Sequence, residues 1–382
     1  MTQGDFTIQP VGQGLFYAGK IGQAFNLVYD CGRGTHSTVG TDSDFALLIS
    51  NYKRHELIND TIDMLVVSHF DSDHANGLFL LLSGKTIVKQ LFIPYSGIGD
   101  YLILFSLLYI TGATSRVEKI SLVLEKTAVN DDESNSDDNS IGISLDLDSK
   151  YTEPDLIKKI SIMPSSTVVS SQQQWLFKFY NMQKSKATIS RIENEFDALL
   201  KINKCNTIQD LLKLKEGLHP TKKTKHYMKT LIREIYKNSL KRLGKDSINK
   251  SSLCLYHKPI NSDKAVCFDY PSSFCNENSE NVGAMLTGDI NLSDDVRANE
   301  FLRFFKNELS ETYFMFLPHH GSYLNWNDLL FNYLDKNTVF IVSAGKNNKY
   351  GHPSSTLISK LFKRGNLIGV ATEQRLIKCL IN

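Results

Sequence analysis

The segment His69-Phe70-Asp71-Ser72-Asp73-His74 places four candidate metal ligands within six residues. It comes directly after an apolar run at 62–67 that predicts a buried strand, so the four side chains lie on a turn at a strand end. Because alternate residues of an extended turn project to the same side, His69 and Asp71 are placed to hold one metal ion, with Asp73 and His74 facing a second. Imidazole and carboxylate ligands suit zinc, manganese or iron. The alternative, a polar turn with incidental histidines, does not account for this density of ligands.

Three further polar groups each follow an apolar, strand-like run. They are Asp289 in Leu286-Thr-Gly-Asp289, His319 and His320 in Pro318-His-His-Gly-Ser322, and His352 in Tyr350-Gly-His-Pro353. Each group taken singly is a common turn sequence. Their shared position after a strand predicts that all of them lie along one edge of the sheets, where Asp289 could bridge two metal ions. Adjacent histidines face different directions, so we expect only one of His319 and His320 to touch a given ion.

Together these motifs resemble the metallo-β-lactamase superfamily. More narrowly, they are similar to the soluble hydrolase domain attached to ComEC-type competence DNA-uptake channels. Three other segments support that narrower resemblance: Val11-Gly-Gln-Gly14, Val28-Tyr-Asp30-Cys-Gly32 and Asn249-Lys-Ser-Ser-Leu253. The resemblance covers roughly residues 6–110 and 249–382, and its strength comes from several modest motifs in the right order.

The resemblance implies a role for each matching residue. His69, Asp71, Asp73 and His74 match the metal-binding loop, and Asp289 matches the carboxylate that bridges the metals. The late histidine that completes the site is His352 or His319, which leaves His320 to contact the substrate or its leaving group. Asp30 matches an aspartate that supports the metal loop from behind. The resemblance also implies one or two divalent ions, and Asp73 as the residue that positions the attacking water.

Two departures from the superfamily pattern bear on the metal. Asp71 stands where the usual loop has histidine, and an oxygen ligand in place of nitrogen shifts the expected preference from zinc towards manganese. No clear counterpart of the usual middle histidine is present, although Asn249 or Ser251 falls near its position. The sequence therefore predicts a more oxygen-rich site that is looser on one side.

The pattern of strands and helices predicts an α/β fold, an αββα sandwich spanning residues 1–382. A basic helical block at 185–248 would interrupt it, and an acidic run at 130–140 is typical of a loop. The expected strands are 6–11, 14–19, 24–29, 62–67, 88–93, 175–180, 252–256, 265–269, 284–287, 313–316, 339–342 and 367–370. The expected helices are 42–52, 101–110, 294–306, 326–334 and 354–363.

The basic block is the feature that suggests a substrate. Between residues 181 and 250 there are 17 Lys and Arg against 7 Asp and Glu. Such a block is placed to follow a phosphate backbone, although a solvated helix face would have the same composition. The candidate nucleic-acid-binding residues are Lys222, Lys223, Lys225, Lys229 and Arg233.

The overall composition is that of an ordinary globular protein, with 41% hydrophobic residues and a formal net charge of +2, which names no partner. No apolar run reaches 18 residues, so no membrane span is predicted, and no signal peptide is visible. The six cysteines show no CxxC pair, and we expect reduced thiols in a cytoplasmic protein.

Three functions fit these observations. The first is a metal-dependent phosphodiesterase or nuclease acting on nucleic acid or a nucleotide, which the basic block favours. The second is hydrolysis of a small acyl or lactone substrate, for which the metal motif serves equally well. The third is a subunit controlled by a protein partner in a multi-component bacterial system, for which anti-phage (antiviral) defence is a plausible setting.

Overall fold

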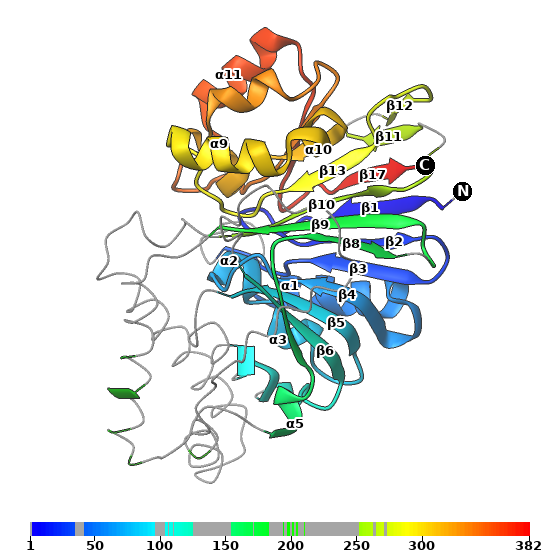
Figure 1. Cartoon of the computed structure of the whole chain (residues 1–382), viewed down its shortest axis with the longest axis vertical. Helices are drawn as coiled ribbons and strands as arrows, with labels where there is room; N and C mark the ends of the chain where they lie inside the picture. The colour runs from blue at the N-terminus through cyan, green and yellow to red at the C-terminus, as the bar shows by residue number, and fades with distance from the viewer. Residues whose placement is uncertain are drawn as a thin grey trace, which may run out of the picture.

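The computed structural model describes most of the two regions that carry the motifs. The described residues are 2–34, 42–95, 104–105, 107–109, 111–124, 154–170, 172–182, 194, 197–198, 201, 204, 210, 252–262, 265–270 and 273–382. Their strands form two sheets, and Figure 1 shows helices at the two opposite sides of the sheets.

The larger sheet has ten strands in the order β12-β11-β17-β1-β2-β3-β4-β5-β6-β7. Strands β1 to β3 form the antiparallel meander that the sequence predicts, and β3 to β7 run parallel. The bounds are β1 Gly4–Ile8, β2 Tyr17–Ile21, β3 Phe25–Tyr29, β4 Thr61–Val66, β5 Ile87–Pro94, β6 Val117–Val123, β7 Ile160–Met163, β11 Val266–Asp269, β12 Ser273–Asn276 and β17 Ile377–Ile381.

The smaller sheet has seven strands in the order β16-β15-β14-β13-β10-β9-β8. Strands β13 to β16 run parallel, while β8, β9, β10 and β13 pair antiparallel. The bounds are β8 Thr167–Ser170, β9 Trp175–Asn181, β10 Leu253–Pro259, β13 Gly283–Leu286, β14 Thr312–Phe316, β15 Val339–Ser343 and β16 Ile368–Ala371.

The helices divide between the two outer sides (Figure 1), with α1 and α3 beside the larger sheet and α9, α10 and α11 beside the smaller one. The bounds are α1 Asp42–Asn51, α2 Ser72–Ala75, α3 Leu78–Leu81, α5 Pro154–Ile157, α9 Asp295–Phe304, α10 Lys306–Ser310 and α11 Ser355–Arg364. Single-turn helical segments occupy Tyr52–Glu56, Ile58–Asp60, Pro318–Gly321, Tyr323–Asn325 and Asp328–Asn332.

Three hydrophobic cores show that these elements form four layers. In β4, Leu65 packs with α1 and α3, whereas Met64 and Val66 face the other sheet. In β10, Leu255 faces inward, while Tyr256 packs with α9 and α10. Because successive side chains of a strand point to opposite faces, strands covered on both sides are apolar along their whole length. The predicted αββα sandwich is confirmed.

Several expected elements differ or lie elsewhere. The helix expected at 326–334 is only a short 3-10 turn, Asp328–Asn332, because Asn327 is extended and its side chain accepts from the Leu329 N–H, which starts a new turn. Strands β6, β7, β8, β12 and β17 had no clear signal in the sequence. Apart from isolated positions, the helical block at 185–248 with Lys222, Lys223, Lys225, Lys229 and Arg233 lies outside the described residues, as does the acidic loop.

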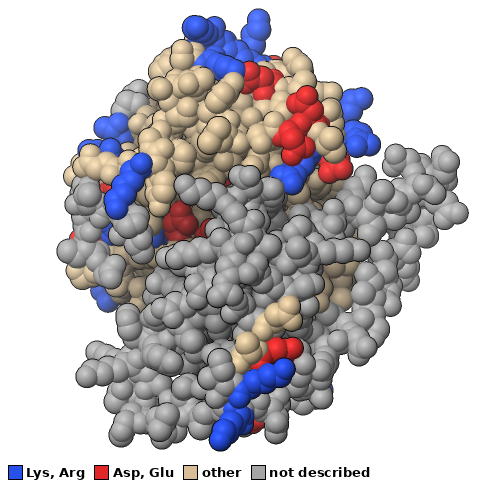
Figure 2. Space-filling view, turned by 90° about the vertical axis from the view of Figure 1, so that its left-hand side faces the viewer, with Lys and Arg blue, Asp and Glu red and all other residues tan. Residues whose placement is uncertain are grey.

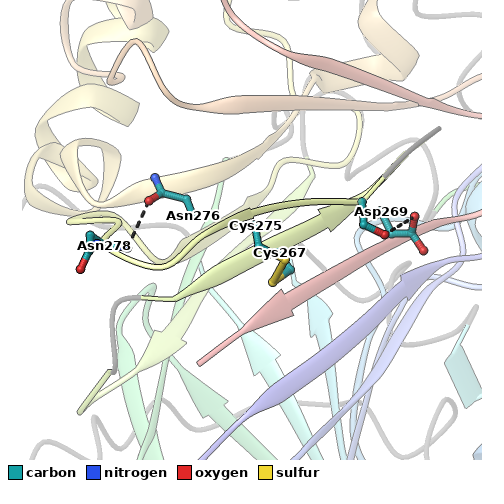
Figure 3. The surroundings of a disulfide bond; sticks show 6 residues. Cys267, Asp269, Cys275, Asn276 and Asn278 are labelled. Atoms are coloured by element: carbon teal, nitrogen blue, oxygen red, sulfur yellow. Dashed lines mark hydrogen bonds between the residues drawn. A yellow bond between two sulfur atoms is a disulfide. The ribbon is translucent and has the colours of Figure 1, made fainter.

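The expectation of reduced cysteines is wrong for one pair. Cys267 and Cys275 lie directly opposite in the β11–β12 hairpin, with their Cα atoms 4.1 Å apart, and a disulfide joins them (Figure 3). The hairpin register brings them together, which spacing along the chain could not show. Cys31, Cys254 and Cys379 are buried free thiols, and Cys205 lies outside the described residues. Because this pair is oxidised, the cysteines no longer indicate that the protein resides in a reducing compartment.

The described part of the chain contains no helix long and apolar enough to cross a bilayer. On the face in Figure 2, the Lys and Arg side chains of the described residues are scattered, and Asp and Glu lie among them. The charge visible on this face therefore does not indicate a partner.

A buried histidine, His257 of β10, lies between the sheets. Its Nδ1 accepts a hydrogen bond from the Trp175 indole, with 3.3 Å between the nitrogens, and its Nε2 lies 2.9 Å from the Tyr17 hydroxyl. Phe6 packs on the ring with 4.8 Å between centroids. Burial in this aromatic setting lowers the pKa of His257 to about 3, so the ring is neutral in the folded protein.

We expect His257 to make the folded state sensitive to acid. In the unfolded chain the imidazole binds a proton near its ordinary pKa of about 6.5, whereas the folded ring binds one only near 3. The contribution of neutral His257 to the free energy of unfolding is therefore fully present well above pH 6.5. It is lost between pH 6.5 and pH 3, by about 1.4 kcal/mol per pH unit. Urea unfolding of wild type and His257→Gln in chelator should show the wild type losing about 2–3 kcal/mol more between pH 7 and pH 4.5. Parallel pH profiles would contradict this assignment.

Candidate metal centre

The candidate site lies where four strands end on the same side of the sandwich. The loop His69–His74 follows β4, and Asp289 follows β13. His319 and His320 follow β14, with the His319 N–H donating to the Gly288 carbonyl at 3.0 Å. The side chain of His352 lies against His319, with 5.4 Å between ring centroids. The structure thus brings together the four sequence motifs that were expected along one edge.

The early glycine motifs support the backbone of the metal loop. A Cβ on Gly32 would lie 2.2 Å from the Asp73 carbonyl oxygen, and one on Gly14 would lie 2.6 Å from the same atom. That carbonyl accepts from the Leu15 N–H at 3.1 Å, and the His74 carbonyl accepts from the Cys31 N–H at 2.9 Å. Only residues without a side chain allow so close a backbone approach.

Buried polar atoms in the centre lack the hydrogen bonds that burial normally demands. His69 Nε2, His74 Nε2 and Asp289 Oδ1 are all buried without a hydrogen bond; the last two lie 3.1 Å apart but are not aligned for one. An unsatisfied buried polar atom costs on the order of 1–3 kcal/mol, so such atoms are rare without a ligand or functional reason. These three residues also place ligand atoms within 4.8 Å of one another. The donor set therefore fits a divalent cation.

Asp289 divides the surrounding imidazoles into two groups. Its Oδ2 lies 3.7 Å from His69 Nε2 and 3.8 Å from His319 Nε2. Its Oδ1 lies 3.1 Å from His74 Nε2 and 3.9 Å from His320 Nε2. Two ligands of one ion, each at roughly 2.1 Å in tetrahedral geometry, lie about 3.4 Å apart. Each oxygen of Asp289 thus lies nearer to its own pair of histidines, at distances of 3.1–3.9 Å.

A second carboxylate accompanies each group. Asp71 Oδ2 lies 4.0 Å from His69 Nε2, and Asp73 Oδ2 lies 3.3 Å from His320 Nε2. Asp71 and Asp73 are both more exposed than Asp289, with side-chain exposures of 23%, 27% and 3%. The centre is therefore closed at Asp289 and open to solvent on the side of the loop carboxylates.

One buried carboxylate fixes the tautomers of both loop histidines. Asp30 Oδ2 accepts from His74 Nδ1 at 2.8 Å and from the Ser68 hydroxyl at 2.6 Å, while its Oδ1 accepts from the Ser68 N–H at 2.7 Å. Since that hydroxyl has a single proton and gives it to Asp30, it must accept from His69 Nδ1, 2.9 Å away. In the neutral form that binds a metal, both histidines would therefore carry their proton on Nδ1 and present the Nε2 lone pair towards Asp289.

The charges of the centre are strongly coupled. Burial lowers the pKa of His69 to about 3, which keeps that imidazole neutral. Although burial alone would lower the pKa of His74, Asp289 and Asp30 raise it well above its ordinary value. Burial would raise the pKa of Asp289 and Asp73, but the surrounding imidazoles hold both below their ordinary range. Asp289 and Asp73 are therefore ionised at neutral pH, as metal-binding carboxylates must be.

The two adjacent histidines occupy an unusual backbone conformation. His319 and His320 have φ angles of 48° and 55°, in the left-handed region that costs non-glycine residues on the order of 1 kcal/mol or more. His320 Nδ1 donates to the Ser343 carbonyl at 2.8 Å, and its Nε2 lies 3.3 Å from Asp73 Oδ2. The strained turn thereby aims the two rings at opposite oxygens of Asp289.

Ser252 is a site residue that sequence reasoning missed by one position. Asn249 and Ser251, the candidates near the missing middle histidine, lie outside the described residues. The Ser252 Oγ accepts from the Asp289 N–H at 3.1 Å and lies 3.5 Å from His69 Nδ1. The segment around Asn249 pointed to this place, although the sequence alone could not show which hydroxyl faces inward.

Comparison with known proteins gives matches to solved structures only. No family model matches the chain, and no curated protein does. Human tRNase Z, short form, is 9% identical with a TM-score of 0.39, and the match covers 97% of this chain and 98% of that one. The metallo-β-lactamase fold protein YhfI from Bacillus subtilis is 8% identical with a TM-score of 0.36, covering 99% and 100%. Unliganded yeast PDE1 is 10% identical with a TM-score of 0.38, covering 100% of each chain.

Proposed function

We propose that this chain, an αββα protein of the metallo-β-lactamase type, is a hydrolase that uses two divalent metal ions to cleave phosphodiesters. The observation that carries the proposal is the position of Asp289. Its two carboxylate oxygens face two separate groups of donors, as expected of a carboxylate that bridges two ions.

Each ion would have four ligand atoms from the chain. His69, Asp71, His319 and Asp289 Oδ2 would hold the first, and Asp73, His74, His320 and Asp289 Oδ1 the second. The sequence left open which late histidine is a ligand. We assign His320 to the second ion because its Nδ1 is already bound to Ser343 and its Nε2 faces Asp73. Two nitrogen and two oxygen donors for each ion suit zinc or manganese.

The chain's own residues would then orient the reaction. Divalent ions bound here would supply a more acidic water and offset negative charge that develops on the substrate. Asp73, on the open side of the centre, is placed to accept a hydrogen bond from the attacking water and orient it. His352, half-buried beside His319, is the imidazole left to contact the substrate or its leaving group.

The metal ions of the loaded centre would favour an anionic substrate. Asp71, Asp73 and Asp289 bring three negative charges to the ligand positions and Asp30 brings a fourth behind His74, against the four positive charges of two divalent ions. The net charge is thus close to zero, and the two cations themselves would attract a phosphodiester anion more strongly than a neutral lactone or ester. The basic segment at 185–248 extends the proposal to nucleic acid, with Lys222, Lys223, Lys225, Lys229 and Arg233 as candidate phosphate contacts.

A substrate panel tests this function. The chain, loaded with zinc or manganese, should hydrolyse bis-p-nitrophenyl phosphate far faster than a matched lactone or p-nitrophenyl acetate. Asp73→Asn should lower kcat by about a hundredfold or more and leave folding unchanged, because it removes the acceptor for the water proton in a half-open position. Faster hydrolysis of the lactone would favour the small-molecule alternative, and no phosphodiester cleavage with any divalent metal would overturn the proposal.

A further inference from the structure

An exposed aromatic ring lies two histidine rings away from Asp289 of the candidate centre. Tyr350 is 58% exposed, and it belongs to the loop that follows β15 and ends at His352. Single exposed aromatic side chains are common, so the exposure of Tyr350 alone indicates nothing. What suggests a ligand for this ring is its connection to the centre through two histidine rings.

A series of contacting rings connects the centre to Tyr350. The ring of Tyr350 is stacked on His352, with centroids 5.9 Å apart and an interplanar angle of 16°. His352 contacts His319 at 5.4 Å, and His319 Nε2 lies 3.8 Å from Asp289. The side-chain exposure rises from 3% at Asp289 to 23% at His319 and to the open surface at Tyr350.

The loop holds this arrangement through one side chain. Asn348 Oδ1 accepts from the N–H of Tyr350 at 3.1 Å and from the N–H of His352 at 3.0 Å. Its Nδ2 donates to the carbonyls of Gly345 and His352 at 2.7 Å and 2.6 Å. The backbone of the loop that carries Tyr350 is thus held before any ligand binds, which reduces the entropy that ordering this loop on binding would cost.

The charge of the loop points to the same class of ligand. Lys349, directly before Tyr350, and Lys346 are both exposed. Exposed aromatic rings interleaved with basic side chains are the combination by which proteins bind single-stranded nucleic acid, since each base offers a π face and each phosphate a negative charge.

We propose that Tyr350 is a stacking platform for a nucleobase, so that the substrate of this centre is a nucleotide or single-stranded nucleic acid with a base next to the scissile phosphate. This inference rests on the proposed phosphodiesterase function and narrows it to one substrate class. It assigns the preference for a base-bearing substrate to Tyr350, a residue that would neither bind a metal nor take part in bond cleavage.

The test compares a dithymidine phosphate with the same backbone lacking both bases, under identical metal loading. We expect the wild type to cleave the base-bearing substrate with a kcat/KM roughly five- to tenfold higher, through a lower KM. Tyr350→Ala should abolish that difference by raising KM, with kcat and cleavage of the abasic substrate unchanged. Tyr350→Phe keeps the π face and should retain the preference.

A matched control is Phe274→Ala in β12, which removes another exposed aromatic ring (47% exposed) at the far edge of the larger sheet. It should change nothing. If Tyr350→Ala keeps the preference for bases, or the wild type has none, the platform is overturned while the phosphodiesterase stands. Cleavage of bis-p-nitrophenyl phosphate without cleavage of either dinucleotide would overturn the platform in the same way. If the wild type cleaves no phosphodiester at all, the proposed function fails with it.

Discussion

Replacing Asp289 by alanine is expected to lower hydrolysis by at least about a thousandfold and to remove tight binding of both ions. The reason is that Asp289 has one oxygen facing each of the two donor groups. Without it, the Nε2 atoms of His69 and His74 lose the carboxylate that they share. The measurement is metal content after dialysis, together with kcat on bis-p-nitrophenyl phosphate.

Glu300→Ala is the matched control, because it removes an exposed carboxylate from α9 outside the centre. It should retain full activity and metal. Asp289→Asn keeps the shape of the side chain and one oxygen, so it should retain at most one ion. If the Asp289→Ala protein kept two ions or a tenth of wild-type activity, the bridging role of Asp289 would be contradicted.

Asp30→Asn is expected to lower metal affinity and activity by at least about a hundredfold while the protein still folds. Asparagine tolerates the left-handed backbone of this residue, whose φ is 58°. Its amide group, however, presents protons where the carboxylate accepted them. His74 Nδ1 would then become an acceptor, and Ser68 could donate to His69, so both histidines would turn a protonated Nε2 towards the metal position.

Two further variants separate the effect on tautomers from the effect on stability. Asp30→Ala leaves three buried donors without a partner and should lower the free energy of unfolding by about 3–5 kcal/mol in urea titrations. Ser68→Ala disturbs His69 alone and should weaken metal binding less than Asp30→Asn. If Asp30→Asn bound metal as tightly as the wild type, the tautomers would not be set by this carboxylate.

The sequence predicted the layers of this fold well because their signal is local. Strands such as β4 and β13 are apolar runs that end in polar motifs, and the buried position of both faces makes those runs continuous. The signal was weak for β12, which lies between two motifs, and for β17, which follows the last of them. The pairing of Cys267 with Cys275 depends on a hairpin register that no spacing rule gives.

The candidate site was predictable as a set of residues and not as an arrangement. The motifs gave Asp289 and the loop ligands, and the structure groups His69 and His74 with Asp289, and Asp73 and His74 with His320. Three features could be seen only in the structure. They are the hydrogen-bond chain from Asp30 through Ser68 to His69, the inward-facing Ser252, and the opposite directions of His319 and His320. Each feature depends on the side of a turn to which a side chain points. Contacts between strands that are far apart in the chain determine that direction.

The central claim is that Asp289 bridges two ions, and the magnetic state of the manganese-loaded protein tests it most directly. Two Mn²⁺ ions joined by one carboxylate are a few ångströms apart, so their spins couple. We predict two manganese ions per chain and an electron paramagnetic resonance spectrum of an exchange-coupled pair, which Asp289→Ala abolishes. A single ion per chain with the six-line spectrum of isolated Mn²⁺ would contradict it.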